Sequence, residues 1–133
     1  MSVFGRRLSG KTVAGVALLM IVMALLPVMT SAPARDIVLV TKDMAYYLEG
    51  DPSMPNPVIE VKAGERVRIV LRNQERGVIH DFAVPAMRAA IDGLRWNEQG
   101  DVSFDVPDAP GNYEYVCRPH LLMMKGVMTV VAM

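Results

Sequence analysis

The stretch Tyr115–Gly126, YVCRPHLLMMKG, brings most of the metal-binding side chains of this chain into one short segment. It contains the only cysteine, Cys117, and one of the two histidines, His120. Two adjacent methionines, Met123 and Met124, follow before the next apolar run. A thiolate, imidazoles and a weak axial thioether are the ligands of mononuclear copper sites that transfer electrons. The stretch therefore predicts three ligands of one copper ion.

The fourth ligand must be the other histidine, His80, which lies in the segment 78–84, VIHDFAV. By the period of two of a β-strand, His80 shares one face with the apolar residues at positions 78, 82 and 84. We therefore expect His80 to point inward, with Asp81 on the opposite side of the strand. The rest of the chain is then a scaffold that holds His80 against the stretch 115–126.

The first 34 residues have the pattern of a secretory signal peptide. A basic start that contains Arg6, Arg7 and Lys11 precedes a nearly continuous apolar run, and Ala32-Pro-Ala34 is a small-residue cleavage site. We expect cleavage after Ala34 and export of the domain 35–133. The alternative is an uncleaved membrane anchor through residues 12–29, and the choice between the Sec and twin-arginine routes stays open.

Charge and cysteine content exclude some classes of protein. The whole chain has 14 basic and 14 acidic residues, and residues 1–34 contain three of the basic and none of the acidic ones. The exported part is therefore weakly acidic, which argues against a nucleic-acid partner. A single cysteine cannot form an internal disulfide. In an oxidising compartment such a thiol must be buried, paired with another chain or bound to a metal.

From Asp36 onward the pattern is that of strands separated by turns, without a long helical period. We expect strands at 37–40, 44–48, 58–61, 66–72, 78–84, 102–106, 113–117 and 126–132. The segment 85–100 is less regular, and we interpret it as a long connection with room for one short helical turn. The prediction is an all-β protein, a Greek-key β-sandwich of about seven or eight strands.

These features resemble the cupredoxins, the small blue copper proteins of the plastocyanin, azurin and amicyanin kind. The resemblance is carried by His80 in VIHDF, the strand that ends at Cys117, the spacing Cys117-x-x-His120, and Met124-Lys-Gly before a final apolar strand. It covers the chain from about Ile37 to the end. It implies one type 1 copper ion with His80, Cys117, His120 and Met124 as its ligands.

The axial ligand has two candidates in sequence. Met124 directly precedes Lys-Gly and the last strand, as in azurin-like and amicyanin-like loops, whereas Met123 fits the count from His120 on the shortest loops of the family. We favour Met124.

Two positions depart from the usual pattern of the family: Asp81 stands where Asn is frequent, and Arg118 where Ser or Thr is frequent. Such neighbours of the ligands tune the metal more than they decide its binding.

The resemblance implies an exported, periplasmic electron carrier that acts as a monomer. Pro119, Leu121 and Leu122 beside His120 would form a small apolar patch where a redox partner docks transiently. The alternative is a copper chaperone or resistance protein, since seven of the eleven methionines follow residue 34. An enzyme is not expected. With two histidines and one cysteine, the chain cannot build a second catalytic copper from histidine or a binuclear CuA centre.

Overall fold

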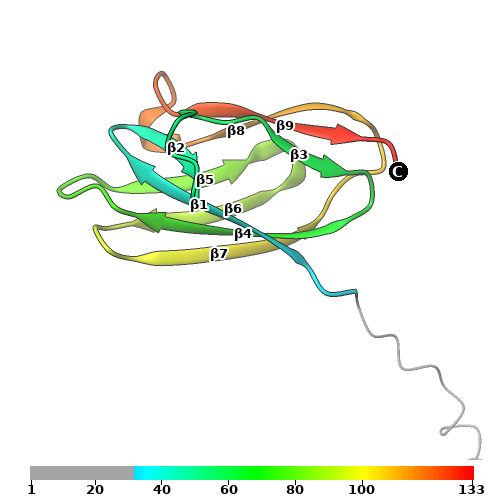
Figure 1. Cartoon of the computed structure of the whole chain (residues 1–133), viewed down its shortest axis with the longest axis horizontal. Coiled ribbons are helices and arrows are strands. Elements are labelled where there is room, and N and C mark those ends of the chain that lie inside the picture. The colour runs from blue at the N-terminus through cyan, green and yellow to red at the C-terminus, as the bar shows by residue number, and fades with distance from the viewer. Residues whose placement is uncertain (1–31) are drawn as a thin grey trace, which may run out of the picture. The chain divides into compact units, whose positions relative to one another are not determined.

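The structure is a computed structural model that describes residues 32–133. The predicted leader, residues 1–34, therefore lies almost wholly outside the described residues. Nine strands form two sheets that pack as a β-sandwich (Figure 1). The predicted all-β class is confirmed, with more strands than the seven or eight expected. Within residues 32–133, no helix has the length and apolar character needed to span a membrane.

Both sheets place strands side by side that are distant in sequence. The four-stranded sheet has the order β2-β1-β4-β7, with bounds β1 Arg35–Lys42, β2 Ala45–Leu48, β4 Arg66–Asn73 and β7 Gln99–Asp105. The five-stranded sheet has the order β3-β9-β8-β5-β6, with bounds β3 Ile59–Lys62, β9 Lys125–Val131, β8 Gly111–Val116, β5 His80–Val84 and β6 Ala89–Leu94. β4 and β7 pair although β5 and β6 lie in the other sheet, which is the kind of crossing that Greek-key connections make.

The period of two that predicted the strands also builds the core. In β1, Ile37 and Leu39 are buried, and in β4 the same holds for Val67, Ile69 and Leu71. These side chains face the other sheet, where Phe82, Val84, Tyr115, Met128 and Val130 are buried. The core thus fills the space between the sheets, as a sandwich requires.

The outer face of the four-stranded sheet is covered by ion pairs. Arg66 lies 2.9 Å from Asp105, and Arg68 lies 3.1 Å from Asp101 and 3.3 Å from Asp36. These partners stand on strands that flank β4, so the alternating arginines of β4 meet carboxylates on both sides. Exposed pairs of this kind contribute little stability each, but they keep this face polar.

The prediction of a long connection over 85–100 is wrong in part. A 3-10 turn, Pro85–Met87, is followed by β6, Ala89–Leu94, which pairs antiparallel with β5 at the edge of its sheet. Ala89 and Ile91 are buried while Ala90 and Asp92 are exposed, so the period of two is present. It was missed because alanine, aspartate and glycine have low strand propensity.

Tyr115 of β8 and Gly126 of β9 are cross-strand partners at the base of the stretch 115–126. The Tyr115 ring is fully buried, and its hydroxyl donates to the Pro57 carbonyl at 2.6 Å. A Cβ atom on residue 126 would stand 2.3 Å from the ring carbon that bears the hydroxyl. A glycine at 126 is therefore required by the close approach of Tyr115.

We expect Gly126→Ala to lower the free energy of unfolding by about 3 kcal/mol, because the buried ring cannot move aside without loss of its packing. Chemical denaturation of the metal-free protein measures this. Gly50→Ala is the matched control, since Gly50 has a positive φ of 84° but nothing within 4 Å of an added Cβ. A cost for Gly126→Ala no greater than that for Gly50→Ala would contradict the steric argument.

Candidate metal centre

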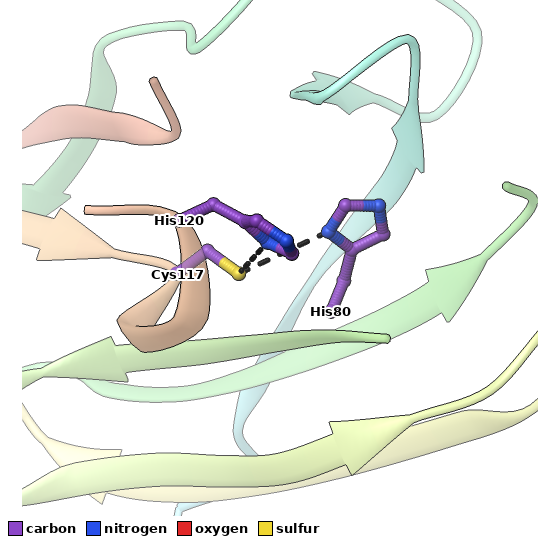
Figure 2. Close-up of side chains that lie close together, drawn as sticks. All are labelled: His80, Cys117 and His120. Carbon is purple, nitrogen blue, oxygen red and sulfur yellow. Dashed lines mark hydrogen bonds between the residues drawn. The ribbon is translucent and has the colours of Figure 1, made fainter. Parts of the chain in front are cut away.

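Three of the four predicted ligands come together at one end of the sandwich. His80 is the first residue of β5, Cys117 directly follows β8, and His120 ends the short turn after it (Figure 2). The Cys117 Sγ lies 3.3 Å from His120 Nδ1 and 3.9 Å from His80 Nδ1. The three donor atoms all lie within 4.8 Å of one another. Segments 37 residues apart in sequence thus present one thiol and two imidazoles to a common point.

The connection from β8 to β9 is folded by its own backbone hydrogen bonds. A 3-10 turn, Arg118–His120, begins directly after Cys117 and contains a proline in its first positions, where a missing N–H costs nothing. The Cys117 N–H donates to the Met124 carbonyl at 2.9 Å, and the Met124 N–H donates to the His120 carbonyl at 2.9 Å. These bonds close the connection, so Cys117 and His120 have a fixed separation.

The two adjacent methionines differ sharply in exposure. Met124 is fully buried, whereas Met123 is 60% exposed. Met123 is held at the surface, where its carbonyl accepts a hydrogen bond from the Asn56 side chain at 3.3 Å. Of the two thioethers, that of Met124 is the one enclosed by the protein.

The backbone around His80 departs in two ways from what the sequence predicts. The strand begins at His80, so Val78 lies before it rather than on its inward face. His80, Phe82 and Val84 share the buried face as expected. Asp81 is also buried, at 4% exposed, because its carboxylate accepts the Arg118 backbone N–H at 2.8 Å and the Arg118 Nε at 2.6 Å. It links the strand of His80 directly to the residue after Cys117.

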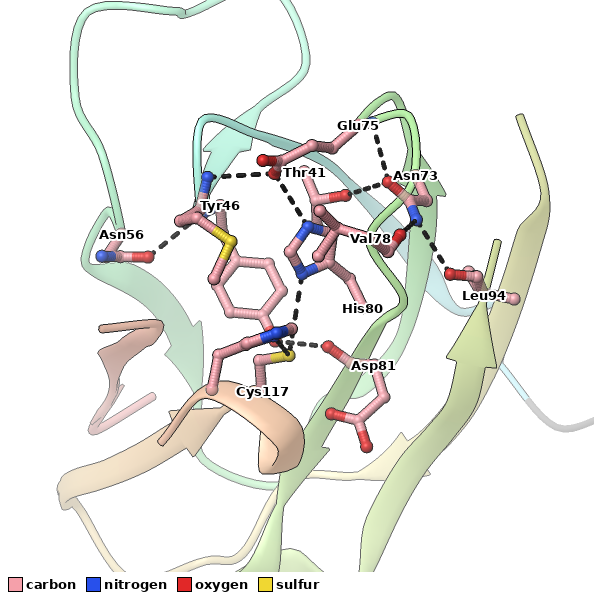
Figure 3. Close-up of polar contacts among 12 residues, drawn as sticks. Thr41, Tyr46, Asn56, Asn73, Glu75, Val78, His80, Asp81, Leu94 and Cys117 are labelled. Atoms are coloured by element: carbon pink, nitrogen blue, oxygen red, sulfur yellow. Dashed lines mark hydrogen bonds and ion pairs between the residues drawn. The ribbon is translucent and has the colours of Figure 1, made fainter. Parts of the chain in front are cut away.

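Glu75 is a site residue that sequence reasoning missed. Its Oε2 lies 2.8 Å from His80 Nε2, the ring nitrogen that faces away from the sulfur (Figure 3). Burial raises the pKa of Glu75, but hydrogen bonds from the Met44 N–H and from His80 outweigh it and hold the pKa below its usual value. The only signal in the sequence was a carboxylate five residues before His80, in the short polar segment between the expected strands 66–72 and 78–84.

The thiol is enclosed by groups that act on its protonation. Cys117 is fully buried, and burial raises the pKa of its thiol, while backbone hydrogen bonds from Asp81 and His120 and the hydroxyl of Tyr46 oppose that rise. Tyr46 is also fully buried, with its hydroxyl donating to the Asp81 carbonyl, and burial raises its own pKa far above the ordinary range. A metal that binds this sulfur displaces the proton of the thiol.

The donor set fits copper. One thiolate and two imidazoles, with a buried thioether nearby in sequence, are the donors of a type 1 copper site. The nitrogens nearest the sulfur are both Nδ1, so the rings can bind one ion while their other nitrogens stay free for hydrogen bonds. Within residues 32–133 this is the one cluster of three or more histidine, cysteine or acidic side chains with metal-site geometry.

The surface beside His120 is apolar. His120 is half-buried, and Leu121, Leu122 and Met123 are 52%, 94% and 60% exposed. Pro119 is also exposed. Of the two histidines, His120 is therefore the more exposed and lies beside apolar side chains, whereas His80 is fully buried.

Comparisons with known proteins agree with this geometry. The profile of a family described as cupredoxin-like domain matches residues 15–130. An auracyanin from Roseiflexus castenholzii superposes with a TM-score of 0.59 at 20% identity, over 75% of this chain and 99% of its own. Auracyanin A from Chloroflexus aurantiacus, called a "blue" copper protein, gives 0.55 at 19% identity, over 74% and 100%.

A third solved structure is larger than this chain. The copper nitrite reductase of Nitrosomonas europaea gives a TM-score of 0.60 at 22% identity, but the match covers 75% of this chain and only 42% of the reductase. At such identities these structures establish the fold alone. No curated protein sequence matches the chain. The family profile spans most of the sequence, and the chain belongs to the cupredoxin-like domain family.

Proposed function

We propose that the protein is an exported carrier of single electrons that uses one type 1 copper ion. The observation that carries the proposal is the convergence of the Cys117 thiol and the His80 and His120 imidazoles, whose donor atoms lie within 4.8 Å of one another. When bound, copper supplies one-electron chemistry by alternating between Cu(I) and Cu(II). Within residues 32–133, no second group of three or more histidine, cysteine or acidic side chains has the geometry of a metal site.

The chain's own residues suit a site that must change little between oxidation states. His80, Cys117 and Met124 are fully buried, and Asp81 and the hydrogen bonds within the connection fix the ligand-bearing segments. A rigid scaffold imposes one geometry on both states of the metal, so little reorganisation accompanies each electron. The full burial of His80, Cys117 and Met124 would keep bulk water away from these three donors.

We propose His80, Cys117 and His120 as the strong ligands and Met124 as the axial one. The burial of Met124 and the exposure of Met123 support this choice. An axial thioether binds weakly and at long range, and its main effect is on the reduction potential. Met123 would then contribute to the surface beside His120.

We expect Met124→Leu to change the reduction potential and the visible spectrum of the copper-loaded protein, because it removes the axial donor. A tenfold change in the relative affinity for Cu(II) and Cu(I) corresponds to about 59 mV. Met123→Leu is the matched control and should leave the potential and the electron paramagnetic resonance spectrum unchanged. If Met123→Leu moves both and Met124→Leu moves neither, the axial assignment is reversed.

We further propose that electrons pass through the exposed edge of His120. Pro119, Leu121 and Leu122 surround that edge, and small apolar patches suit encounters that bury little area and dissociate quickly. A transient redox partner docking here would come close to a ligand of the metal without entering the protein. A second copy of the protein can do the same, which gives electron self-exchange.

We expect Leu121→Lys to slow electron self-exchange by about tenfold or more, because each encounter would bring two ammonium groups together at the patch. The thiolate-to-copper absorption should stay intact. Nuclear magnetic resonance line broadening in mixtures of oxidised and reduced protein measures the rate. Met133→Lys adds the same charge at an equally apolar, 94% exposed position near the C-terminus, at the other end of β9 (Figure 1). Equal effects of both variants would refute docking at Leu121.

A copper chaperone is the second candidate function. Its support is the exposure of Met54 and Met123, at 58% and 60%, since surface thioethers favour Cu(I). The enclosed set of donors at Cys117 argues for retention of the metal instead. Transfer of Cu(I) to a competing chelator within seconds would favour the chaperone, and exchange over hours would favour the electron carrier.

We propose export directed by residues 1–34, with cleavage after Ala34 as the sequence pattern predicts. We expect the protein recovered from the periplasm of an expressing bacterium to begin at Arg35, as determined by intact mass. Ala34→Leu should block processing because the cleavage site needs a small residue. Ala132→Leu is the matched control, since Ala132 is exposed and lies far from the cleavage site in sequence. Ala45→Leu would not serve, because Ala45 is buried. A membrane-bound protein of full mass would support the anchor instead.

A further inference from the structure

Glu75 makes a contact that the ligand set alone does not require. It stands in the connection between β4 and β5, and its Oε2 lies 2.8 Å from His80 Nε2. His80 is fully buried, while the Glu75 side chain is 20% exposed. A carboxylate therefore covers the outer nitrogen of a ligand ring whose inner nitrogen faces the Cys117 sulfur at 3.9 Å.

The position of Glu75 is fixed by the surrounding structure. Its backbone N–H donates to Asn73 Oδ1 at 2.8 Å, and its Oε2 also accepts the Met44 N–H at 3.0 Å. Asn73 is 1% exposed and donates in turn to the carbonyls of Val78 and Leu94, each at 2.8 Å (Figure 3). Hydrogen bonds thus hold Glu75 through both its backbone and its side chain, unlike a surface glutamate that contacts a histidine by chance.

The contact has two chemical consequences. A carboxylate oxygen accepts this hydrogen bond, so His80 donates it from Nε2–H, which leaves the Nδ1 lone pair for a metal. The negative charge also lies next to one ligand ring, where it stabilises a doubly charged ion more than a singly charged one. The free Nδ1 can bind copper in either oxidation state, whereas the negative charge favours Cu(II) over Cu(I).

We propose that Glu75 is a positioning residue that fixes the tautomer of His80 and, through its negative charge, lowers the reduction potential of the copper site by favouring Cu(II) over Cu(I). This rests on the proposed function, since it assumes a copper ion between His80 and Cys117. Glu75 binds no metal itself in this assignment. Its influence reaches the ion through the imidazole ring, as carboxylates behind ligand histidines do in other metal sites.

The test is Glu75→Gln in the full-length, copper-loaded protein. Glutamine keeps an oxygen that accepts the hydrogen bond from His80 Nε2–H, but it removes the negative charge. We expect Cu(II) binding to weaken by about tenfold more than Cu(I) binding, which raises the potential by about 59 mV. The thiolate-to-copper absorption should be retained. Glu98→Gln is the matched control, because the Glu98 carboxylate accepts a hydrogen bond from the Arg95 N–H rather than from a ligand, and its potential should not move.

A second measurement needs no variant. In the metal-free wild-type protein at neutral pH, 15N nuclear magnetic resonance should find His80 with its proton on Nε2, and a proton on Nδ1 would overturn the proposal. An unchanged potential in Glu75→Gln, with the absorption intact, would overturn it as well and leave the proposed function standing. If the wild-type protein gives no type 1 spectrum with copper, the proposed function fails, and the role of Glu75 fails with it.

Discussion

The carboxylate of Asp81 links the segment that contains His80 to the segment that contains Cys117. β5 and β8 have one paired position, Ala83 with Val116. The strand pairing between them therefore does not extend to His80 and Cys117. Beyond that point Asp81 accepts two hydrogen bonds from Arg118, one from the backbone and one from the side chain. Hydrogen bonds that involve a charged group contribute about 1.5–3 kcal/mol each. Together with the backbone hydrogen bond from Asp81 to the Cys117 thiol, this link holds the segment of His80 against that of Cys117 beyond their one paired position.

A second buried polar group organises the other side of His80. Asn73 is the last residue of β4. Its side-chain oxygen accepts hydrogen bonds from the Thr41 hydroxyl and the Glu75 N–H, and its side-chain nitrogen donates to the carbonyls of Val78 and Leu94. Because every polar atom of this side chain has a partner, its burial stabilises one arrangement of the connection 74–79. That connection brings Glu75 over the ring of His80. The two networks thus fix the first residues of β5, where His80 lies.

The two sides of the sandwich differ in what they offer to other molecules. The outer face of the four-stranded sheet neutralises its arginines with neighbouring carboxylates, as the pairs of Arg66 and Arg68 illustrate. The end of the sandwich next to His120 instead exposes the apolar side chains of Leu121 and Leu122. Such a contrast is expected where one small region is reserved for transient contact and the rest is kept polar.

The sequence by itself determined the sandwich class and the group of three side chains His80, Cys117 and His120. Both depend on patterns that are local or that concern rare residues: the period of two along each strand, and the spacing of Cys117, His120 and the single remaining histidine. It did not reveal β6, whose alternation is carried by alanines with little strand propensity.

Only the tertiary structure decided which methionine is enclosed, that Asp81 is buried, and that Glu75 faces His80. Met123 and Met124 are chemically identical neighbours, and the turn closed on the His120 carbonyl is what directs one outward and the other inward. Glu75 meets His80 because Asn73 folds the connection between them, and the bonds of Asn73 reach residues up to 32 positions away. Contacts between residues so far apart depend on how the sheets pack. They therefore produce no periodic pattern in the sequence.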